Sequence, residues 1–314
     1  MLRIGLTGGI AAGKSVVARR LEGLGAVLVD ADVLARRVVE PGSEGLQQVV
    51  NAFGREILAE DGSLDRPALG RVIFGDAAAR ERLNAIIHPR VRSASASLIV
   101  AAPEDAIVVE DIPLLVETGQ AARFHLVIVV DAPHAERVRR MIEHRGMDES
   151  DAEQRIDAQV PGPERLREAD AVLSNAGTAD QLLAAVDALW RSRILPFAAD
   201  LATGQPAVIA AVRPMPSDMA LEGTSDLPRR VRAKIEAALP EGVQATCEPL
   251  DEERSDDVTT AALRIVVREA DHEDVAAALA AAGFPQRDPG SGLHRGSDPA
   301  TSVDVRVVLA NSRD

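Results

Sequence analysis

Apolar residues in the N-terminal part of the chain fall into short continuous runs separated by stretches with helical spacing. The runs cover residues 2–7, 26–29, 106–109, 126–130 and 171–173. Several of them lack the strict alternation of a half-exposed strand, which is typical of a parallel sheet buried on both faces. The pattern therefore predicts an α/β fold built from βαβ units.

The segments between these runs have helical spacing. It predicts helices over residues 14–24, 133–146, 148–159, 163–170 and 179–193, the last ending near Pro196. Residues 31–104 are too many for one crossover helix and too regularly patterned for a loop. They predict a helical insertion on the rim of the sheet for a second substrate, interrupted at Pro41-Gly42, Asp61-Gly62 and His88-Pro89.

The composition and the hydrophobic periodicity of the sequence change after residue 198. Residues 199–228 contain proline, glycine and serine with little periodicity, which is typical of a linker. Strand-like runs at 263–267 and 303–309, with an alanine-rich helix at 272–282, then predict a small α/β domain. The expected organisation is a first domain over 1–198, a linker over 199–228 and a second domain over 229–314.

Composition and charge narrow the function classes. The chain has 314 residues, 46% of them hydrophobic, and a formal charge of −14, which opposes binding to nucleic acid or to an anionic membrane. Its first residues read as a strand rather than a leader, no apolar run is long enough for a membrane span, and a single cysteine allows no internal disulfide. We expect a cytoplasmic protein with a small-molecule partner, neither nucleic acid nor membrane; the sequence does not give its oligomeric state.

A lysine near the N-terminus points to nucleotide binding. Of 35 basic residues only Lys14 and Lys234 are lysines, and Lys14 lies in Gly8-Gly9-Ile10-Ala11-Ala12-Gly13-Lys14-Ser15, which fits the phosphate-loop motif between a strand and a helix. Loop amides and the helix N-terminus can bind phosphate oxygens. We expect the nucleotide to contact Gly8, Gly9, Ile10, Ala11, Ala12, Gly13, Lys14, Ser15 and Val16, with Lys14 on the β- and γ-phosphates and Ser15 on Mg²⁺. The alternative is a glycine-rich turn with an incidental lysine.

Two carboxylates end the second apolar run. Asp30 and Asp32 follow residues 26–29, at the strand end where open α/β sheets bind their ligands. A carboxylate there can accept a proton from an attacking hydroxyl or hold Mg²⁺ through water. The alternative interpretation is a helix N-cap.

With these motifs the sequence resembles the dephospho-CoA kinase family over roughly residues 1–195. The matching pieces are Gly5 to Ile10, Gly13-Lys14-Ser15, Asp30-Ala31-Asp32, Pro41-Gly42, Phe53-Gly54, Asp61-Gly62 with Leu64, Leu83-Asn84, His88-Pro89, Ile112 to Leu115 with Glu117, Arg155 with Gln159, Ala169-Asp170 and Asn175. The resemblance implies a nucleotide-kinase-like P-loop fold with a lid, and transfer of the γ-phosphate of ATP to the ribose 3′-hydroxyl of dephospho-CoA.

The resemblance also implies roles for single residues. Asp32 is the expected base, Asp30 supports it, and Arg140 on the lid helix joins Lys14 in stabilising the transferring phosphate. The insertion and the segment around Pro113 and Leu114 are expected to hold the acceptor, as is His88. For His88 the alternative is a buried histidine at a helix end. Arg137 lies on the same helix face as Arg140, but it is expected to be solvated, as are Arg139 and Arg145.

The sequence departs from the family pattern in the phosphate loop, where Ala11 replaces a glycine and Val16 a threonine. Alanine fits there only if its φ angle is not forced to be positive.

The second domain faintly resembles a degenerate GrpB-like domain, and its role is either support of folding or an unknown kind of binding.

Two other functions are left open for the chain, a different small-metabolite or nucleoside-phosphate kinase and a nucleotide-dependent regulator. A guanine-reading Asn-Lys-x-Asp motif is impossible, because the only lysines follow Gly13 and Ala233.

Overall fold

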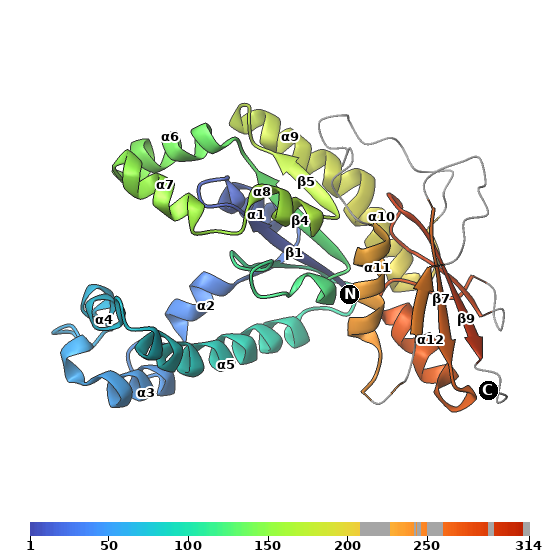
Figure 1. Ribbon diagram of the computed structural model, residues 1–314, viewed down its shortest axis with the longest axis horizontal. Coiled ribbons are helices and arrows are strands. Elements are labelled where there is room, and N and C mark those ends of the chain that lie inside the picture. Colours follow the sequence, from blue (N-terminus) through green and yellow to red (C-terminus); the bar gives the residue numbers. More distant parts are fainter. Residues whose placement is uncertain (208–226, 242, 244–245, 250–259, 288–291, 310–314) are drawn as a thin grey trace. The chain divides into compact units, whose positions relative to one another are not determined.

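The computed structural model describes residues 1–207, 227–241, 243, 246–249, 260–287 and 292–309 (Figure 1). Contacts between Cα atoms divide the chain into two compact units. Unit 1 comprises Met1–Leu28, Glu104–Val109 and Pro113–Asp314, and unit 2 comprises Val29–Pro103 and Glu110–Ile112.

The predicted α/β sheet is confirmed, with all five expected strands. They are β1 (Leu2–Gly8), β2 (Val27–Asp30), β3 (Ile107–Asp111), β4 (Leu126–Asp131) and β5 (Ala171–Ser174), in the order β2-β3-β1-β4-β5. β1 pairs in parallel with β4, with Leu6 opposite Ile128, and β4 pairs in parallel with β5. Leu6 and Ile128 are fully buried, as expected for strands covered on both faces.

Helices follow the strands of this sheet as expected. They are α1 (Lys14–Gly23), α6 (His134–Arg145), α7 (Glu149–Asp157), α8 (Gly162–Arg167) and α9 (Ala179–Leu189), and a short turn, η2 (Ala121–Arg123), precedes β4. Apolar residues of α1 and α9, among them Val17 and Val186, join the buried core of the sheet. The guanidinium of Arg20 makes two hydrogen bonds of 2.7 Å to Asp187 and so links α1 to α9.

The prediction that the last helix ends near Pro196 is wrong. After α9 the chain continues through a π-helical turn, η3 (Trp190–Ile194), into α10 (Leu195–Thr203). Pro196 lies in the first turn of α10, directly after the π-helical turn, in which the N–H of Leu195 bonds to the backbone oxygen of Trp190. Helix therefore occupies the start of the predicted linker, and residues 208–226 of that linker lie outside the described residues.

Unit 2 is the predicted helical insertion. Its elements are α2 (Ala31–Arg37), α3 (Glu44–Phe53), η1 (Arg55–Ile57), α4 (Arg66–Ile73) and α5 (Ala77–Ala101). Ser43, Asp65 and Asp76 cap α3, α4 and α5 by accepting hydrogen bonds from backbone N–H groups three residues on. Apolar side chains of the unit 2 helices form a separate core that includes Val49, Phe53, Leu69 and Leu83.

The predicted interruption at His88-Pro89 is absent from the structure, because α5 runs for 25 residues with Pro89 inside it. Ala79 and Leu83 anchor the first half of the helix in the core of unit 2. Packing there overrides the preference of proline for a helix end. Neither α5 nor any other helix in the described part of the chain is long and apolar enough to cross a membrane.

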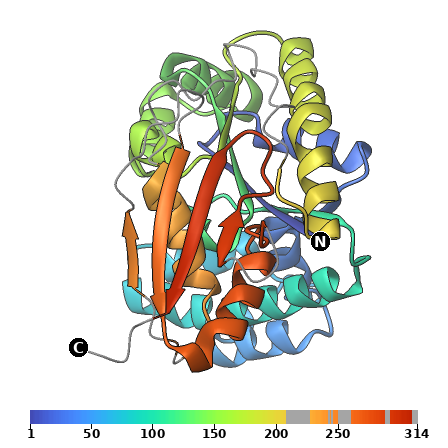
Figure 2. The ribbon, with the colours of Figure 1, turned by 90° about the vertical axis from the view of Figure 1, so that its right-hand side faces the viewer.

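The C-terminal region forms a second, mixed sheet (Figure 2). Its elements are α11 (Leu227–Ala238), β6 (Thr246–Pro249), β7 (Thr260–Val267), η5 (Glu269–Asp271), α12 (His272–Ala281), β8 (Leu293–Arg295) and β9 (Ser302–Leu309), with strand order β6-β7-β9-β8. Only the β7–β9 pairing is parallel. Ile235 of α11 and Leu279 of α12 pack with Ile265 and Val305 in one core. The domain limits at 198 and 228 stay predictions.

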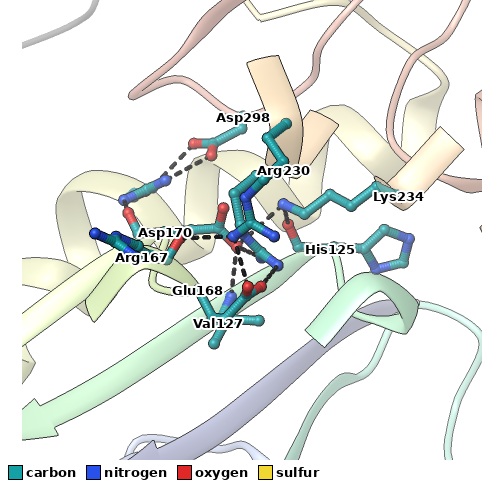
Figure 3. A network of polar contacts seen from close by, with 10 residues as sticks. His125, Val127, Arg167, Glu168, Asp170, Arg230, Lys234 and Asp298 are labelled. Carbon is teal, nitrogen blue, oxygen red and sulfur yellow. Dashed lines mark hydrogen bonds and ion pairs between the residues drawn. The ribbon is translucent and has the colours of Figure 1, made fainter. Parts of the chain in front are cut away.

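A buried polar cluster surrounds Asp170, immediately before β5 (Figure 3). Its Oδ2 atom accepts hydrogen bonds from Arg230 Nη2 at 2.8 Å and Lys234 Nζ at 3.0 Å, both on α11. Arg193 donates to the backbone oxygen of Asp170 at 2.6 Å and makes two hydrogen bonds to Asp298. Residues before 198 and after 227 thus share one cluster of opposite charges.

Candidate functional site: a phosphate loop held by two helices

The loop between β1 and α1 requires glycine at both ends of its motif. A Cβ atom on Gly8 would lie 2.5 Å from the backbone oxygen of Val130, and one on Gly13 would collide with the side-chain amide of Asn175. Gly13 also has φ = 103°, a conformation that favours glycine. These glycines let neighbouring strands and side chains approach the loop backbone closely.

Ala11 has a positive φ angle of 59°. Among the described residues it is the one non-glycine residue in that conformation. The expectation that alanine fits here only with a negative φ angle is therefore wrong. The left-handed conformation costs a residue with a Cβ atom about 1–2 kcal/mol. Part of this cost is offset, because Ala11 packs with Ile10 against the apolar cluster of α6 and α7 that contains Met141 and Ile156.

Side chains from outside the loop hold its carbonyl groups. Arg137 Nε donates to the backbone oxygen of Ile10 at 2.9 Å, and Asn175 Nδ2 donates to that of Ala12 at 2.8 Å. Arg140 Nη1 lies 3.3 Å from the backbone oxygen of Ala11. Carbonyls engaged in this way do not face a bound phosphate, and consecutive N–H groups of such a loop form an anion-binding concavity.

The arginines of α6 behave differently from one another. Arg137 is only 7% exposed, so the expectation that it is solvated is wrong. Burial lowers its pKa, as does the nearby Arg165, while Asp131 opposes both. Arg139 is exposed and pairs with Glu136 and Glu143, as expected for a solvated side chain.

Arg140 is half-buried and directed at the loop. Besides the contact to Ala11, it donates from Nη2 to the backbone oxygen of Asn175 at 3.0 Å and from Nε to Glu136 at 2.8 Å. Hydrogen bonds from Arg139 and Arg140 lower the pKa of Glu136 to about 2, so this carboxylate is ionised and orients both guanidinium groups. Arg137 and Arg140 both contact backbone oxygens of the loop, as expected for two residues on the same face of α6.

The start of α1 presents its amides without a side-chain cap. Its N-cap is Gly13, which offers no side-chain acceptor, and the N–H of Val16 bonds back to the backbone oxygen of Gly13 at 3.0 Å. A helix start without a capping side chain favours the binding of an anion. Lys14 is half-buried as the first residue of the helix, Ser15 is exposed, and Val16 packs against the main core. Within the described residues, no group of three or more histidine, cysteine or acidic side chains is arranged to hold a metal.

In unit 2, the structure separates the two candidate carboxylates. Asp30 is the N-cap of α2, and its Oδ1 atom accepts a hydrogen bond from the N–H of Val33 at 2.9 Å. Asp32 lies in the first turn of α2 with an exposed side chain. The capping interpretation therefore applies to Asp30, whereas Asp32 does not act as the cap.

The residues predicted to hold the acceptor lie in both units. His88 is exposed and inside α5, which overturns the alternative of a buried histidine at a helix end. In unit 1, the backbone oxygen of Pro113 accepts a hydrogen bond from Thr7 Oγ1 at 3.2 Å, and Leu114 is 52% exposed. Acceptor binding by these three residues stays a prediction.

Three residues that hold the loop are not assigned to it by any sequence pattern. Arg137 is expected in solvent, and Gln159 and Asn175 enter only through the family resemblance. Gln159 accepts a hydrogen bond from the N–H of Ile10 across 149 positions of sequence. The available signal is the spacing of Gln159 from Arg155 in the family pattern, which specifies no contact.

Comparison with known proteins points to one family. The family model described as dephospho-CoA kinase matches residues 2–181. The chain is similar to a protein named dephospho-CoA kinase from Mycolicibacterium paratuberculosis, with 52% identity over 218 residues, covering 69% of this chain and 53% of that protein. A protein of the same name from Leifsonia xyli is 52% identical over 193 residues, 60% of this chain and 98% of the relative.

A solved structure gives the same picture of the fold. The crystal structure of TT1252 from Thermus thermophilus is 35% identical, with a TM-score of 0.54, and covers 60% of this chain and 96% of its own. The chain spans about half the length of the mycobacterial relatives that it matches, at 53% of the length of two of them.

Proposed function

Because the chain belongs to the dephospho-CoA kinase family, we propose that it transfers the γ-phosphate of ATP to the ribose 3′-hydroxyl of dephospho-CoA, giving CoA and ADP. The observation that carries the proposal is the family match over residues 2–181, which includes the phosphate loop and both candidate carboxylates. The loop geometry supports it, because the loop carbonyls are bonded to side chains and the helix start is uncapped.

On the donor side, we assign phosphate binding to the loop amides, Lys14 and Arg140. The ammonium group of Lys14 at the start of α1 neutralises charge on the β- and γ-phosphates. Arg140 lies against the loop backbone, and its planar guanidinium can bridge phosphate oxygens as charge develops on the transferring group. Val16 contributes packing of α1 beneath the loop rather than a polar contact.

On the acceptor side, we assign the base to Asp32. Its exposed carboxylate takes the proton of the ribose 3′-hydroxyl while that oxygen forms a bond to the γ-phosphorus. The bond from this phosphorus to the bridging oxygen breaks, and its electron pair stays on ADP. Asp30 fixes the start of α2, and His88, Pro113 and Leu114 contribute to acceptor binding.

Mg²⁺ belongs to this proposal as the companion of ATP. The exposed hydroxyl of Ser15 fits it, because Mg²⁺ prefers oxygen ligands and retains several waters and phosphate oxygens. When bound, the ion supplies charge neutralisation on the phosphates.

A coupled assay tests the proposal with the full chain, ATP, Mg²⁺ and dephospho-CoA. We expect ADP release that depends on dephospho-CoA and a product phosphorylated at the ribose 3′ position. Lys14→Met should reduce turnover by about 10²-fold or more, since it removes a charge that stabilises the transition state. Arg139→Met removes an exposed charge and should keep wild-type turnover. Turnover of other small alcohols or nucleoside phosphates, but not of dephospho-CoA, would overturn the proposed acceptor.

We further propose that residues 229–314 are a reduced GrpB-like region that supports folding of the kinase region, in a cytoplasmic protein. The cluster around Asp170 and the compact core of this region support that role.

A further inference from the structure

The peptide groups on both sides of Ile10 are held by two side chains that also contact each other. Gln159 Oε1 accepts a hydrogen bond from the N–H of Ile10 at 2.8 Å. Arg137 Nε donates to the backbone oxygen of Ile10 at 2.9 Å, and its Nη2 donates to Gln159 Oε1 at 2.9 Å. Because consecutive peptide groups are fixed, the backbone at Ile10 cannot turn without breaking two of these bonds.

The backbone of Gln159 is itself fixed. Its N–H donates to the backbone oxygen of Ile156 at 3.1 Å. Arg165, only 2% exposed, donates from Nη2 to the backbone oxygen of the next residue, Val160, at 2.8 Å. Ile156 packs in the apolar cluster against Ile10. The side chain of Gln159 is thus directed at the loop from a rigid position.

Gly9, directly after the first glycine of the motif, lies next to Arg137. A Cβ atom on Gly9 would lie 2.6 Å from Cζ of Arg137 and 2.7 Å from its Nη2 atom. Glycine at this position therefore leaves room for the guanidinium of Arg137 rather than for a ligand. The N–H of Ala12 bonds back to Gly9 at 3.0 Å, so the same turn carries the strained Ala11.

We infer that Gln159 is a positioning residue for the phosphate chain of the nucleotide, acting through Arg137 and the backbone of Ile10. It holds the loop in the conformation in which the carbonyls of Ile10 and Ala12 are bonded to side chains and turned away from a bound anion. Without the acceptor on Gln159, the N–H of Ile10 must find another partner and the loop occupies other conformations. The apparent affinity for a phosphate chain then falls in proportion to the competent fraction, so a loop that is competent for one tenth of the time binds about tenfold more weakly.

The test is calorimetric titration of the full chain with ADP and Mg²⁺. Gln159→Met keeps the length of the side chain and removes the acceptor, and we expect ADP to bind about tenfold more weakly. Gln159→Glu keeps an acceptor for both partners and should bind ADP at least about threefold more tightly than Gln159→Met. Gln154→Met is the matched control, an exposed glutamine on α7 five positions before Gln159, and should equal the wild type.

A second variant, at Gly9, tests the same contacts by displacing Arg137. Gly9→Ala displaces the flexible end of Arg137 and should weaken ADP binding to a similar extent, with a change in melting temperature no larger than that of Gln159→Met. An ADP affinity of Gln159→Met within twofold of the wild type, or equal losses in Gln159→Glu and Gln159→Met, would overturn the inference.

This inference rests on nucleotide binding within the proposed function, but ADP binding needs no acceptor. A wild-type chain that binds ADP and does not phosphorylate dephospho-CoA would refute the proposed reaction and leave the role of Gln159 to the titration.

Discussion

Asp30 and Asp32 lie two positions apart, yet their carboxylates have different environments. Asp30 caps α2, whereas Asp32 is exposed in the first turn of the same helix. Asn keeps much of the shape of Asp and caps helices about as well, but it is not a base. We therefore expect Asp32→Asn to lose about 10²–10⁴-fold in turnover with little change in ADP affinity.

Asp30→Asn is the matched control for that change, measured for turnover, ADP binding and melting temperature. It should retain the cap and most of the turnover. A selective loss of turnover in Asp30→Asn, with a normal Asp32→Asn, would transfer the role of base to Asp30.

Ala11 carries a conformational cost that substitutions can reveal. Its φ angle of 59° suits glycine, and a β-branched side chain is a worse fit than a methyl group. Ala11→Val should lower the free energy of unfolding by more than about 1 kcal/mol. Ala11→Gly relieves strain but adds freedom to the unfolded chain, so its net change should stay within about 1 kcal/mol. Urea denaturation measures both, and an unchanged Ala11→Val would show that the loop relaxes to a negative φ.

At the scale of elements, α5 contains a proline that a helix interior does not favour. Pro89 lacks the N–H that would bond to the carbonyl of Ala85, and its ring crowds that turn. Pro89→Ala should raise the free energy of unfolding by about 1–3 kcal/mol, measured by urea denaturation. Ser93→Ala, an exposed change on the same helix, should stay within about 0.5 kcal/mol. Equal effects would mean that α5 is already kinked at Pro89 without cost.

The elements that the sequence predicts best are those whose signals are local. The phosphate loop is a contiguous motif, and the strands are continuous apolar runs, so both follow from neighbouring residues. The paths through Pro89 and Pro196 depend on packing and on position within a helical turn, which periodicity does not reveal. The contacts of Gln159 and Arg137 with Ile10 span 149 and 127 positions, so no local pattern contains them.

For the whole molecule, the cluster around Asp170 makes the C-terminal region part of the stability of unit 1. Burial alone would raise the pKa of Asp170, but Lys234, Arg230 and Arg193 together lower it to about 2 (Figure 3). This carboxylate is therefore charged at neutral pH and compensates cations from both sides of residues 199–228. Because the charges are buried, removal of one partner leaves the others uncompensated.

Asp170→Asn should accordingly lower the free energy of unfolding by about 3–5 kcal/mol. Glu236→Gln breaks an exposed ion pair with Arg232 on α11 and should cost less than about 0.5 kcal/mol. Trp190, buried in η3, reports by fluorescence on the region before residue 198, and circular dichroism reports on all helices. We expect the two signals to change in one transition; separate transitions, or a small effect of Asp170→Asn, would show that the regions are stable independently.

His125 makes the stability of the same unit depend on pH. Its Nδ1 atom accepts a hydrogen bond from the N–H of Arg3 at 2.9 Å, and its Nε2 atom lies 2.8 Å from the backbone oxygen of Ala281 in α12. Burial lowers its pKa from 6.5 to about 4, and the cations Lys234 and Arg3 add to this effect. The folded protein therefore holds a neutral ring where the unfolded chain binds a proton.

The sign of the effect follows from this difference. Stability from the neutral ring is fully present above pH 6.5 and is lost as the pH falls toward 4, about 2 kcal/mol by pH 5. His125→Gln offers both an acceptor and a donor without a titrating ring, so the fall between pH 7.5 and pH 5 should shrink by about that amount in urea denaturation. Burial also lowers the pKa of His294, so some dependence of stability on pH remains in the His125→Gln variant. His144→Gln, at an exposed position, should keep the wild-type slope, and an unchanged slope in His125→Gln would mean that the ring is protonated in the folded state at pH 5.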